Sequence, residues 1–174
     1  MMHPMTDSQV QPLSPYSPLW PATFEMEKRN LHRLLGEAVL IEHIGSTAVP
    51  GLGGHPIIDV MVGTPDLAIV ERRIPDLVAD GYRYAPEFEK AMPQRRYFTR
   101  VDGAPGRFQV SAVVLDSPFW KSRLAFRDAL RSDAALADKY WRLKQRLVAR
   151  FPNDRAAYND GKSEFIRSAI EGRA

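Results

Sequence analysis

Apolar positions recur along the chain with two different spacings, which separate predicted strands from predicted helices. Short apolar runs bounded by Gly, Pro, Asp or Ser are typical of buried strands. Several such runs lie between residues 38 and 115, and the last two read as a hairpin around a turn rich in Gly and Pro. The predicted strands are 38–44, 56–62, 82–85, 96–101 and 108–115, and the predicted hairpin turn is 102–106.

Helical spacing of apolar residues predicts helices on both sides of these strands. One helix is expected over 21–35, ending at Gly36, and another over 64–79 with a kink or restart at Pro75. Three helices are expected to close the chain: one from Ser117 to about Arg131, one from Asp133 with an apolar stripe, and one after the break at 151–154. The stripe consists of Leu136, Tyr140, Leu143 and Leu147. The pattern predicts an α/β (α+β) fold, a mixed β-sheet flanked by helices, with a helical segment over about 117–171.

The first eighteen residues differ from the rest in composition. They hold four prolines among Ser, Gln and Thr, which predicts a flexible or extended lead-in over 1–18. Tyr16 and Trp20 are expected to anchor its end. Residues 19–174 are long enough for one domain with its own core, so a single domain is predicted there.

Composition narrows the classes of function. The chain has no cysteine, which excludes disulfides, thiol catalysis and Cys-zinc sites. Its net charge of +3 suits an anionic small substrate and gives no strong nucleic-acid signal. No apolar run has the length of a membrane span, and the start lacks the pattern of a signal peptide, so a cytoplasmic location without membrane association is expected.

Asp59 is the residue that most needs an explanation. It is a single carboxylate inside the apolar run 56–62, and an unpaired buried charge is costly. A carboxylate is a preferred oxygen ligand of Mg²⁺. The alternative is a structural Asp that pairs with an arginine or with backbone N–H groups.

Gly45, Ser46 and Thr47 follow the strand predicted before Asp59. A glycine at a strand end allows a sharp turn, and the following N–H and hydroxyl groups can donate to phosphate oxygens. The alternative is an ordinary turn in which Ser46 caps a helix. Gly-Ser followed about a dozen residues later by an Asp in an apolar strand fits the nucleotidyltransferase pattern, although Met61 stands where a second carboxylate is expected.

The stretch EHIGSTAVPGLGGHPIID, over 42–59, resembles the signature of the GrpB family. The resemblance extends to YSPLWP at 16–21, to LAFRDAL at 124–130 and to the last helix with Lys162. It implies a nucleotidyltransferase-like fold, Mg²⁺ or Mn²⁺ as cofactor, and a nucleoside triphosphate with an unknown acceptor as substrates. An association with dephospho-coenzyme A kinase is also implied, because the family occurs fused to that enzyme. Two positions depart from the family pattern: His55 replaces a lysine, and Arg107-Phe108-Gln109-Val110 replaces a His-apolar-His strand.

Further residues along the chain are candidates for the site. His55, Arg127 and Lys162 are predicted phosphate or substrate contacts, and Glu42 is predicted as a second metal ligand; each also has an ordinary structural explanation, such as an ion pair or a side chain that reaches solvent. Tyr158 is expected mainly to pack in the core. One arginine among 95, 96 and 100 is expected to reach the site. The basic residues Arg142, Lys144, Arg146 and Arg150 are interpreted as a solvated helix face, and the polar segment 86–94 as a loop over the site.

Three functions therefore stay open. The first is a nucleotidyltransferase in which Asp59 and Ser46 are catalytic and Gly45, Ser46 and Thr47 hold the phosphates. The second is a nucleotide- or phosphate-binding protein without transfer activity, serving as a sensor or regulatory module. The third, implied only by the family resemblance, is a partner protein in coenzyme A metabolism.

Overall fold

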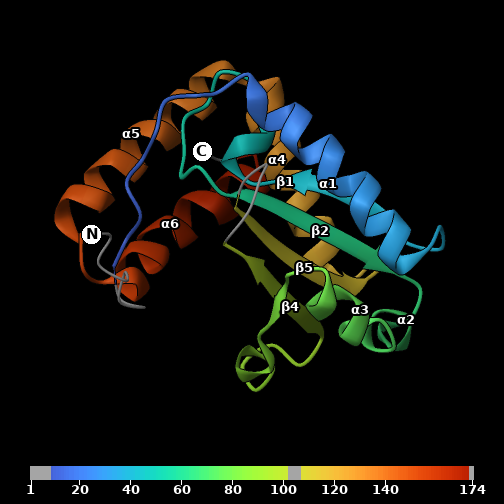
Figure 1. Ribbon diagram of the computed structural model, residues 1–174. Coiled ribbons are helices and arrows are strands. Elements are labelled where there is room, and N and C mark those ends of the chain that lie inside the picture. The colour runs from blue at the N-terminus through green and yellow to red at the C-terminus, as the bar shows by residue number, and fades with distance from the viewer. Residues whose placement is uncertain (1–8, 102–106, 173–174) are drawn as a thin grey trace.

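The computed structural model describes residues 9–101 and 107–172. The predicted hairpin turn at 102–106 lies outside the described residues. Figure 1 shows a central sheet with α1 across it, and α5 and α6 standing to one side.

The sheet is mixed, as the sequence predicts. Its five strands lie in the order β1-β2-β5-β4-β3. Their bounds are Leu40–Ile44 for β1, Ile58–Thr64 for β2, Arg83–Tyr84 for β3, Arg95–Arg100 for β4 and Phe108–Val114 for β5. β2 and β5 pair in parallel and every other pair is antiparallel. All five predicted strands are present, with ends shifted by one or two residues.

One face of the sheet is covered by α1 (Leu19–Leu35), α2 (Leu67–Glu71) and α3 (Ile74–Ala79). Val60 and Val62 of β2 point into the apolar core on this side, together with Phe98 and Phe108. The predicted restart at Pro75 is confirmed, because α2 ends at Glu71 and Pro75 lies in the first turn of α3. In that turn a proline removes no hydrogen bond.

The other face of the sheet is covered by α4 (Pro118–Ser132), which packs with α5 (Ala134–Arg150) and α6 (Arg155–Ile170). Each of the three begins at a side chain that accepts a backbone N–H, namely Ser117, Asp133 and Asp154. Such caps satisfy N–H groups that have no partner inside the helix. The predicted helical segment is thus confirmed. In the described part of the chain, no helix has both the length and the apolar character needed to cross a membrane.

Two short 3₁₀ helices complete the fold, η1 at Ser46–Ala48 and η2 at Pro86–Phe88. η1 follows β1 directly, and η2 lies in the polar segment before β4. Both contribute residues to the cavity described below.

Residues 9–18 belong to the predicted flexible or extended lead-in over 1–18; residues 1–8 lie outside the described part. This segment runs beside α5 before α1 begins (Figure 1). Ser14 and Gly54 exchange two backbone hydrogen bonds of 2.8 and 2.9 Å, and Val10 N–H donates to the carbonyl of Pro152 at 3.0 Å. Tyr16 and Trp20 meet edge to face at 5.6 Å, which confirms their anchoring role. The segment is extended, as its prolines predict, but tertiary hydrogen bonds hold it in place.

Candidate functional site

Asp59 lies at the edge of a cavity of about 810 Å³, within the size range of ligand pockets. On β2 it pairs with Ile44 of β1 and Gln109 of β5, and it faces the α4 side because Val60 faces the opposite core. Burial raises the pKa of Asp59 to about 6, although nearby Lys162, Arg123, Lys144 and Arg155 act in the opposite direction. The structure therefore holds a single desolvated carboxylate against several cations.

Gly45 makes the close approach of β1 to Asp59 possible. Its φ of +75° lies in the left-handed region that favours glycine. A Cβ at this position would lie 2.6 Å from Asp59 Oδ2. The Gly-Ser turn and the carboxylate, separated by a dozen residues in sequence, are thus in direct contact.

Ser46 and Thr47 both line the cavity, but their hydroxyls have different partners. The Thr47 hydroxyl is 2.8 Å from His43 Nε2, and the His43 ring stacks on Phe24 at 4.6 Å. Burial, with Arg131 and Arg127 nearby, lowers the pKa of His43 to about 4, so the ring is neutral at pH 7. The contact between the uncharged His43 and Thr47 side chains holds the turn in position.

Lys144 requires a correction to the sequence analysis, which places it on a solvated helix face. The side chain is only 2% exposed. Its Nζ donates to Ser46 Oγ and to the carbonyl of Gly53, both at 2.7 Å. Lys144 follows Tyr140 by four residues and precedes Leu147 by three, so it lies on the buried stripe itself. That spacing was the sequence signal for its burial.

Lys162, His55 and Tyr158 form one wall of the cavity. Lys162 Nζ lies 4.3 Å from the centre of the Tyr158 ring, and burial lowers the pKa of Lys162 to about 8. His55 Nε2 is 3.0 Å from the Tyr158 hydroxyl, and His55 Nδ1 is 3.4 Å from the carbonyl of Pro12. Burial also lowers the pKa of His55 to about 4. At pH 7 His55 is therefore neutral and Lys162 supplies the positive charge.

Glu42 and Arg127 lie together, outside the set of described residues that line the cavity. Arg127 donates to Glu42 Oε2 at 2.6 Å, to the carbonyl of His43 at 3.1 Å and to Asp128 at 2.9 Å. This places Glu42 in the structural pairing that the sequence analysis keeps as its alternative. The pair ties β1 to α4, and the structure does not bring Glu42 and Asp59 together as two ligands of one metal.

Of the three arginines on β4, Arg95 lines the cavity. Arg96 pairs with Glu71, and Arg100 pairs with Glu27 and Asp80. Arg123 from α4 and Arg155 from the start of α6 also line the cavity. Neither stands out in the sequence, because only helix packing brings them to Asp59.

The polar segment 86–94 also contributes to the site. Phe88 of η2 lines the cavity and meets Tyr97 edge to face at 5.5 Å.

The charge of the cavity is strongly one-sided. Its lining contains a single carboxylate, Asp59, and five cationic side chains, Arg95, Arg123, Lys144, Arg155 and Lys162. Over residues 9–101 and 107–172 none of these five takes part in an ion pair. Cations gathered without carboxylate partners favour a polyanionic ligand.

The chemistry of the donor set bears on the implied metal. No group of three or more His, Cys, Asp or Glu residues that can hold a metal occurs in the described part of the chain. Met61, at the position of the expected second carboxylate, is fully buried with Ile44, Val113 and Trp120. The residues present fit one divalent ion bound by Asp59 and by oxygens of a ligand, since Mg²⁺ commonly takes one or two carboxylates plus phosphates.

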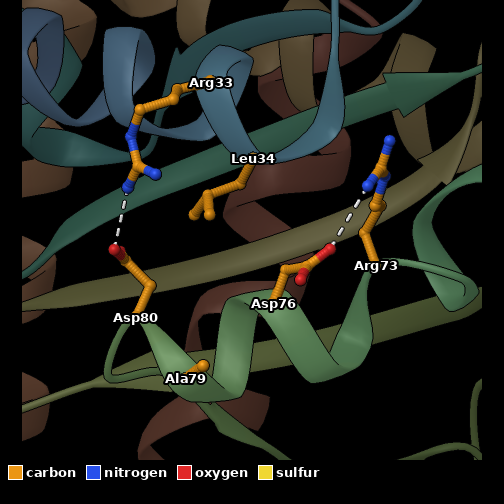
Figure 2. A pocket seen from close by; sticks show the side chains of 6 residues that line it. All are labelled: Arg33, Leu34, Arg73, Asp76, Ala79 and Asp80. Atoms are coloured by element: carbon orange, nitrogen blue, oxygen red, sulfur yellow. Dashed lines mark hydrogen bonds and ion pairs between the residues drawn. The ribbon is translucent and has the colours of Figure 1, made fainter.

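A second, shallower cavity of about 410 Å³ lies between α1 and α3. Figure 2 shows that its charged side chains are paired with one another: Arg33 with Asp80 at 2.8 Å and Arg73 with Asp76 at 3.3 Å. Leu34 lies between the two pairs. Because these charges already have partners, we place the candidate site at Asp59.

The sequence profile of the family described as GrpB protein matches residues 11–172. The chain belongs to the GrpB family. It is 36% identical over 163 residues to the UPF0157 protein SCO7215 of Streptomyces coelicolor, covering 93% of this chain and 83% of that protein. It is 33% identical over 157 residues to the UPF0157 protein YqkA of Bacillus subtilis, covering 90% of this chain but only 45% of that longer protein.

Solved structures support the same assignment. The crystal structure of the conserved protein GrpB from Enterococcus faecalis matches with a TM-score of 0.80 and 32% identity, over 92% of this chain and 96% of that chain. The Cid1 poly(U) polymerase bound to MgATP matches with a TM-score of 0.56 and 15% identity, over 78% of this chain and 44% of that chain. At that identity the likeness concerns the fold alone. This GrpB protein therefore has a nucleotidyltransferase-like fold, as its sequence predicts.

Proposed function

We propose that the cavity binds a nucleoside triphosphate with Mg²⁺ or Mn²⁺ and transfers the nucleoside monophosphate to an acceptor that is not identified. One observation carries the proposal: Asp59 touches the Gly45 turn and faces five cations that lack ion-pair partners within the described residues. A triphosphate supplies negatively charged partners for these cations. The metal ion supplies a positively charged partner for the desolvated Asp59 carboxylate.

The side chains divide into two roles under this proposal. Lys162, Arg123 and Arg155 neutralise the phosphates, because they are the cations that act on Asp59 from α4 and α6. The Ser46 hydroxyl donates to a phosphate oxygen from the turn. Asp59 is the protein ligand of the ion, which withdraws charge from the phosphates when bound. A bound cation also favours the ionised form of Asp59, offsetting the effect of burial.

Binding without transfer is the second candidate, and Met61 favours it. Transfer by two metal ions needs more than one carboxylate, and Met61 is buried in an apolar cluster with Trp120. The β5 partners of Asp59 and Met61 are Gln109 and Ser111, neither of which is an acid. Under this candidate the protein senses a nucleotide.

Titration calorimetry tests whether the protein binds a nucleotide, which both candidate functions require. Each nucleoside triphosphate is titrated into the wild-type protein with and without Mg²⁺ or Mn²⁺, and into Asp59→Asn. We expect metal-dependent binding that the variant loses by at least about tenfold in affinity. Asp160→Asn, at an exposed position of α6 that does not line the cavity, serves as the matched control and is expected to bind like the wild type. Equal binding by Asp59→Asn and the wild type would refute the role given to Asp59.

Transfer is then tested with α-labelled nucleotide and candidate acceptors. Label that reaches an acceptor supports the transferase, whereas binding without transfer supports the sensor. The association with dephospho-coenzyme A kinase stays a prediction, as does the cytoplasmic location. Co-purification of the kinase with the tagged protein tests the association.

A further inference from the structure

Lys144 has an environment that is unusual for a lysine. It is almost fully buried, yet within residues 9–101 and 107–172 its Nζ forms no ion pair and contacts neutral groups: the Ser46 hydroxyl, the Gly53 carbonyl and the faces of two aromatic rings. The ring centres of Tyr140 and Trp141 lie 4.8 and 5.5 Å from Nζ. Buried charges are normally paired with an opposite charge.

The contact between Lys144 and Ser46 depends on two glycines. A Cβ at Gly54 would lie 2.8 Å from Ser46 Cβ and 3.4 Å from Lys144 Nζ. A Cβ at Gly53 would lie 2.7 Å from both the Ser14 carbonyl oxygen and the Trp141 ring. The loop can therefore pass between α5 and the turn only because these residues have no side chain. This close packing brings an amine and a hydroxyl together at hydrogen-bond distance.

An amine in such a place is suited to accept a proton. Burial, together with Lys162 nearby, lowers the pKa of Lys144 to about 7, while Asp59 acts in the opposite direction. A substantial fraction of Lys144 is therefore neutral near pH 7. Serine is a weak nucleophile that needs an adjacent base, and Ser46 Oγ lies 2.7 Å from this amine while facing the cavity.

We propose that Ser46 is a covalent acceptor of the nucleoside monophosphate, with Lys144 as its base. The inference rests on the proposed nucleotide binding and names a chemical step at the same site. Ser46 Oγ forms a bond to the α-phosphorus. The bond from that phosphorus to the α–β bridging oxygen breaks, and pyrophosphate leaves with the electron pair. The hydroxyl proton passes to Lys144 Nζ. The products are a phosphodiester on Ser46, an ammonium at Lys144 and free pyrophosphate.

The proposed step does not require the second carboxylate that the cavity lining lacks. In a two-metal site, metal ions activate the attacking hydroxyl and neutralise charge on the phosphates. Here the place of the second carboxylate is occupied by Met61 in an apolar cluster. An amine beside the hydroxyl performs the activation without a second ion, and general bases of this kind contribute about 10²–10⁴-fold in rate.

The test is intact-protein mass spectrometry after incubation with each nucleoside triphosphate and Mg²⁺ or Mn²⁺, followed by peptide mapping. We expect one nucleoside monophosphate per chain, on the peptide that contains Ser46, and none on Ser46→Ala. Lys144→Arg keeps the positive charge but cannot act as a base at neutral pH. At saturating nucleotide it is expected to form the adduct at least about tenfold more slowly than wild type. Lys139→Met, at an exposed position of the same helix, is the matched control and is expected to form the adduct at the wild-type rate.

The outcomes separate this inference from the function on which it rests. Calorimetric binding by the wild type with no adduct overturns the covalent step and leaves nucleotide binding intact. An adduct on another residue, or one formed by Lys144→Arg at the wild-type rate, also overturns it. Absence of binding to any nucleotide refutes both proposals. Circular dichroism and thermal unfolding establish that each variant is folded.

Discussion

The carboxylate of Asp59 occupies the space that a side chain at position 45 would need. An added Cβ at Gly45 would lie 2.6 Å from Asp59 Oδ2, a distance that real Cβ contacts essentially never show. The glycine of the turn and the acid of the neighbouring strand are therefore two halves of one local arrangement. A side chain at position 45 would therefore have to displace the Asp59 carboxylate.

Gly45→Ala tests this contact through stability. The backbone conformation of Gly45, with φ +75° and ψ −172°, costs a non-glycine residue about 1–3 kcal/mol, and the overlap with Asp59 adds to that. Gly51→Ala is the matched control, because Gly51 also has a positive φ, of +82°, but a Cβ there would have no atom within 4 Å. Urea unfolding is expected to show the larger loss for Gly45→Ala. Equal losses would contradict the close contact with Asp59.

Asp59→Asn is expected to stabilise the protein at neutral pH while removing the proposed metal-dependent binding. The pKa of Asp59 is raised to about 6 by burial, above its ordinary value of about 4. The native state then binds more protons than the unfolded state between these values, so this group costs stability above pH 6 and the cost fades as the pH falls to about 4. The variant is expected to be about 1–3 kcal/mol more stable at pH 8, with the gap closing by pH 4.

Urea unfolding at several pH values measures this effect. Asp160→Asn, on the exposed side of α6, is the control and is expected to stay within about 0.5 kcal/mol of wild type throughout. A constant difference between Asp59→Asn and wild type from pH 4 to pH 8 would refute the interpretation.

The charge state of Lys144 is expected to respond to its neighbours. Its pKa is lowered to about 7 by burial, with Lys162 adding to the decrease and Asp59 opposing it. Carbon-13 NMR of labelled lysines is expected to show a titration midpoint near 7, which moves lower in Asp59→Asn. A midpoint near 10 in the free protein would show that Lys144 is not desolvated in solution.

The segment 9–18 is expected to contribute to the cavity through its backbone contacts. Ser14→Pro removes the N–H that donates to Gly54, at a cost of about 1 kcal/mol or more. Because Gln9, Val10 and Gln11 line the cavity, freeing the segment is also expected to weaken nucleotide binding. Ser14→Ala keeps the N–H and is the control. Limited proteolysis is expected to cleave near residue 14 faster in the proline variant; identical cleavage patterns would argue against the pinned segment.

The parts of the fold that could be predicted from the sequence depend on local patterns. The apolar runs around Asp59, the glycine at Gly45 and the caps at Ser117 and Asp133 all act through neighbours in the chain. The parts that could not be predicted depend on tertiary distance. The Glu42 carboxylate is a suitable metal ligand by its chemistry. Only the packing of α4 on β1 shows that it already pairs with Arg127.

The burial of Lys144 is not predicted by its charge. The charge favours a solvated helix face, although the spacing from Tyr140 and Leu147 places Lys144 on the buried stripe. The pairing of Ser14 with Gly54, within the predicted flexible or extended lead-in, likewise depends on a distant partner. Lys144 donates to the carbonyl of Gly53, so both residues find a partner in the loop 53–55, which the sequence marks by its glycines.

The cavity is assembled from the two extremes of the described chain. Its lining includes Gln9 to Gln11, Asp59 of β2, and Tyr158 and Lys162 of the last helix. During synthesis from the N-terminus, the strand with Asp59 leaves the ribosome about a hundred residues before α6 does. The site therefore cannot form on a partly made chain, and ligand binding reports that the whole domain has folded.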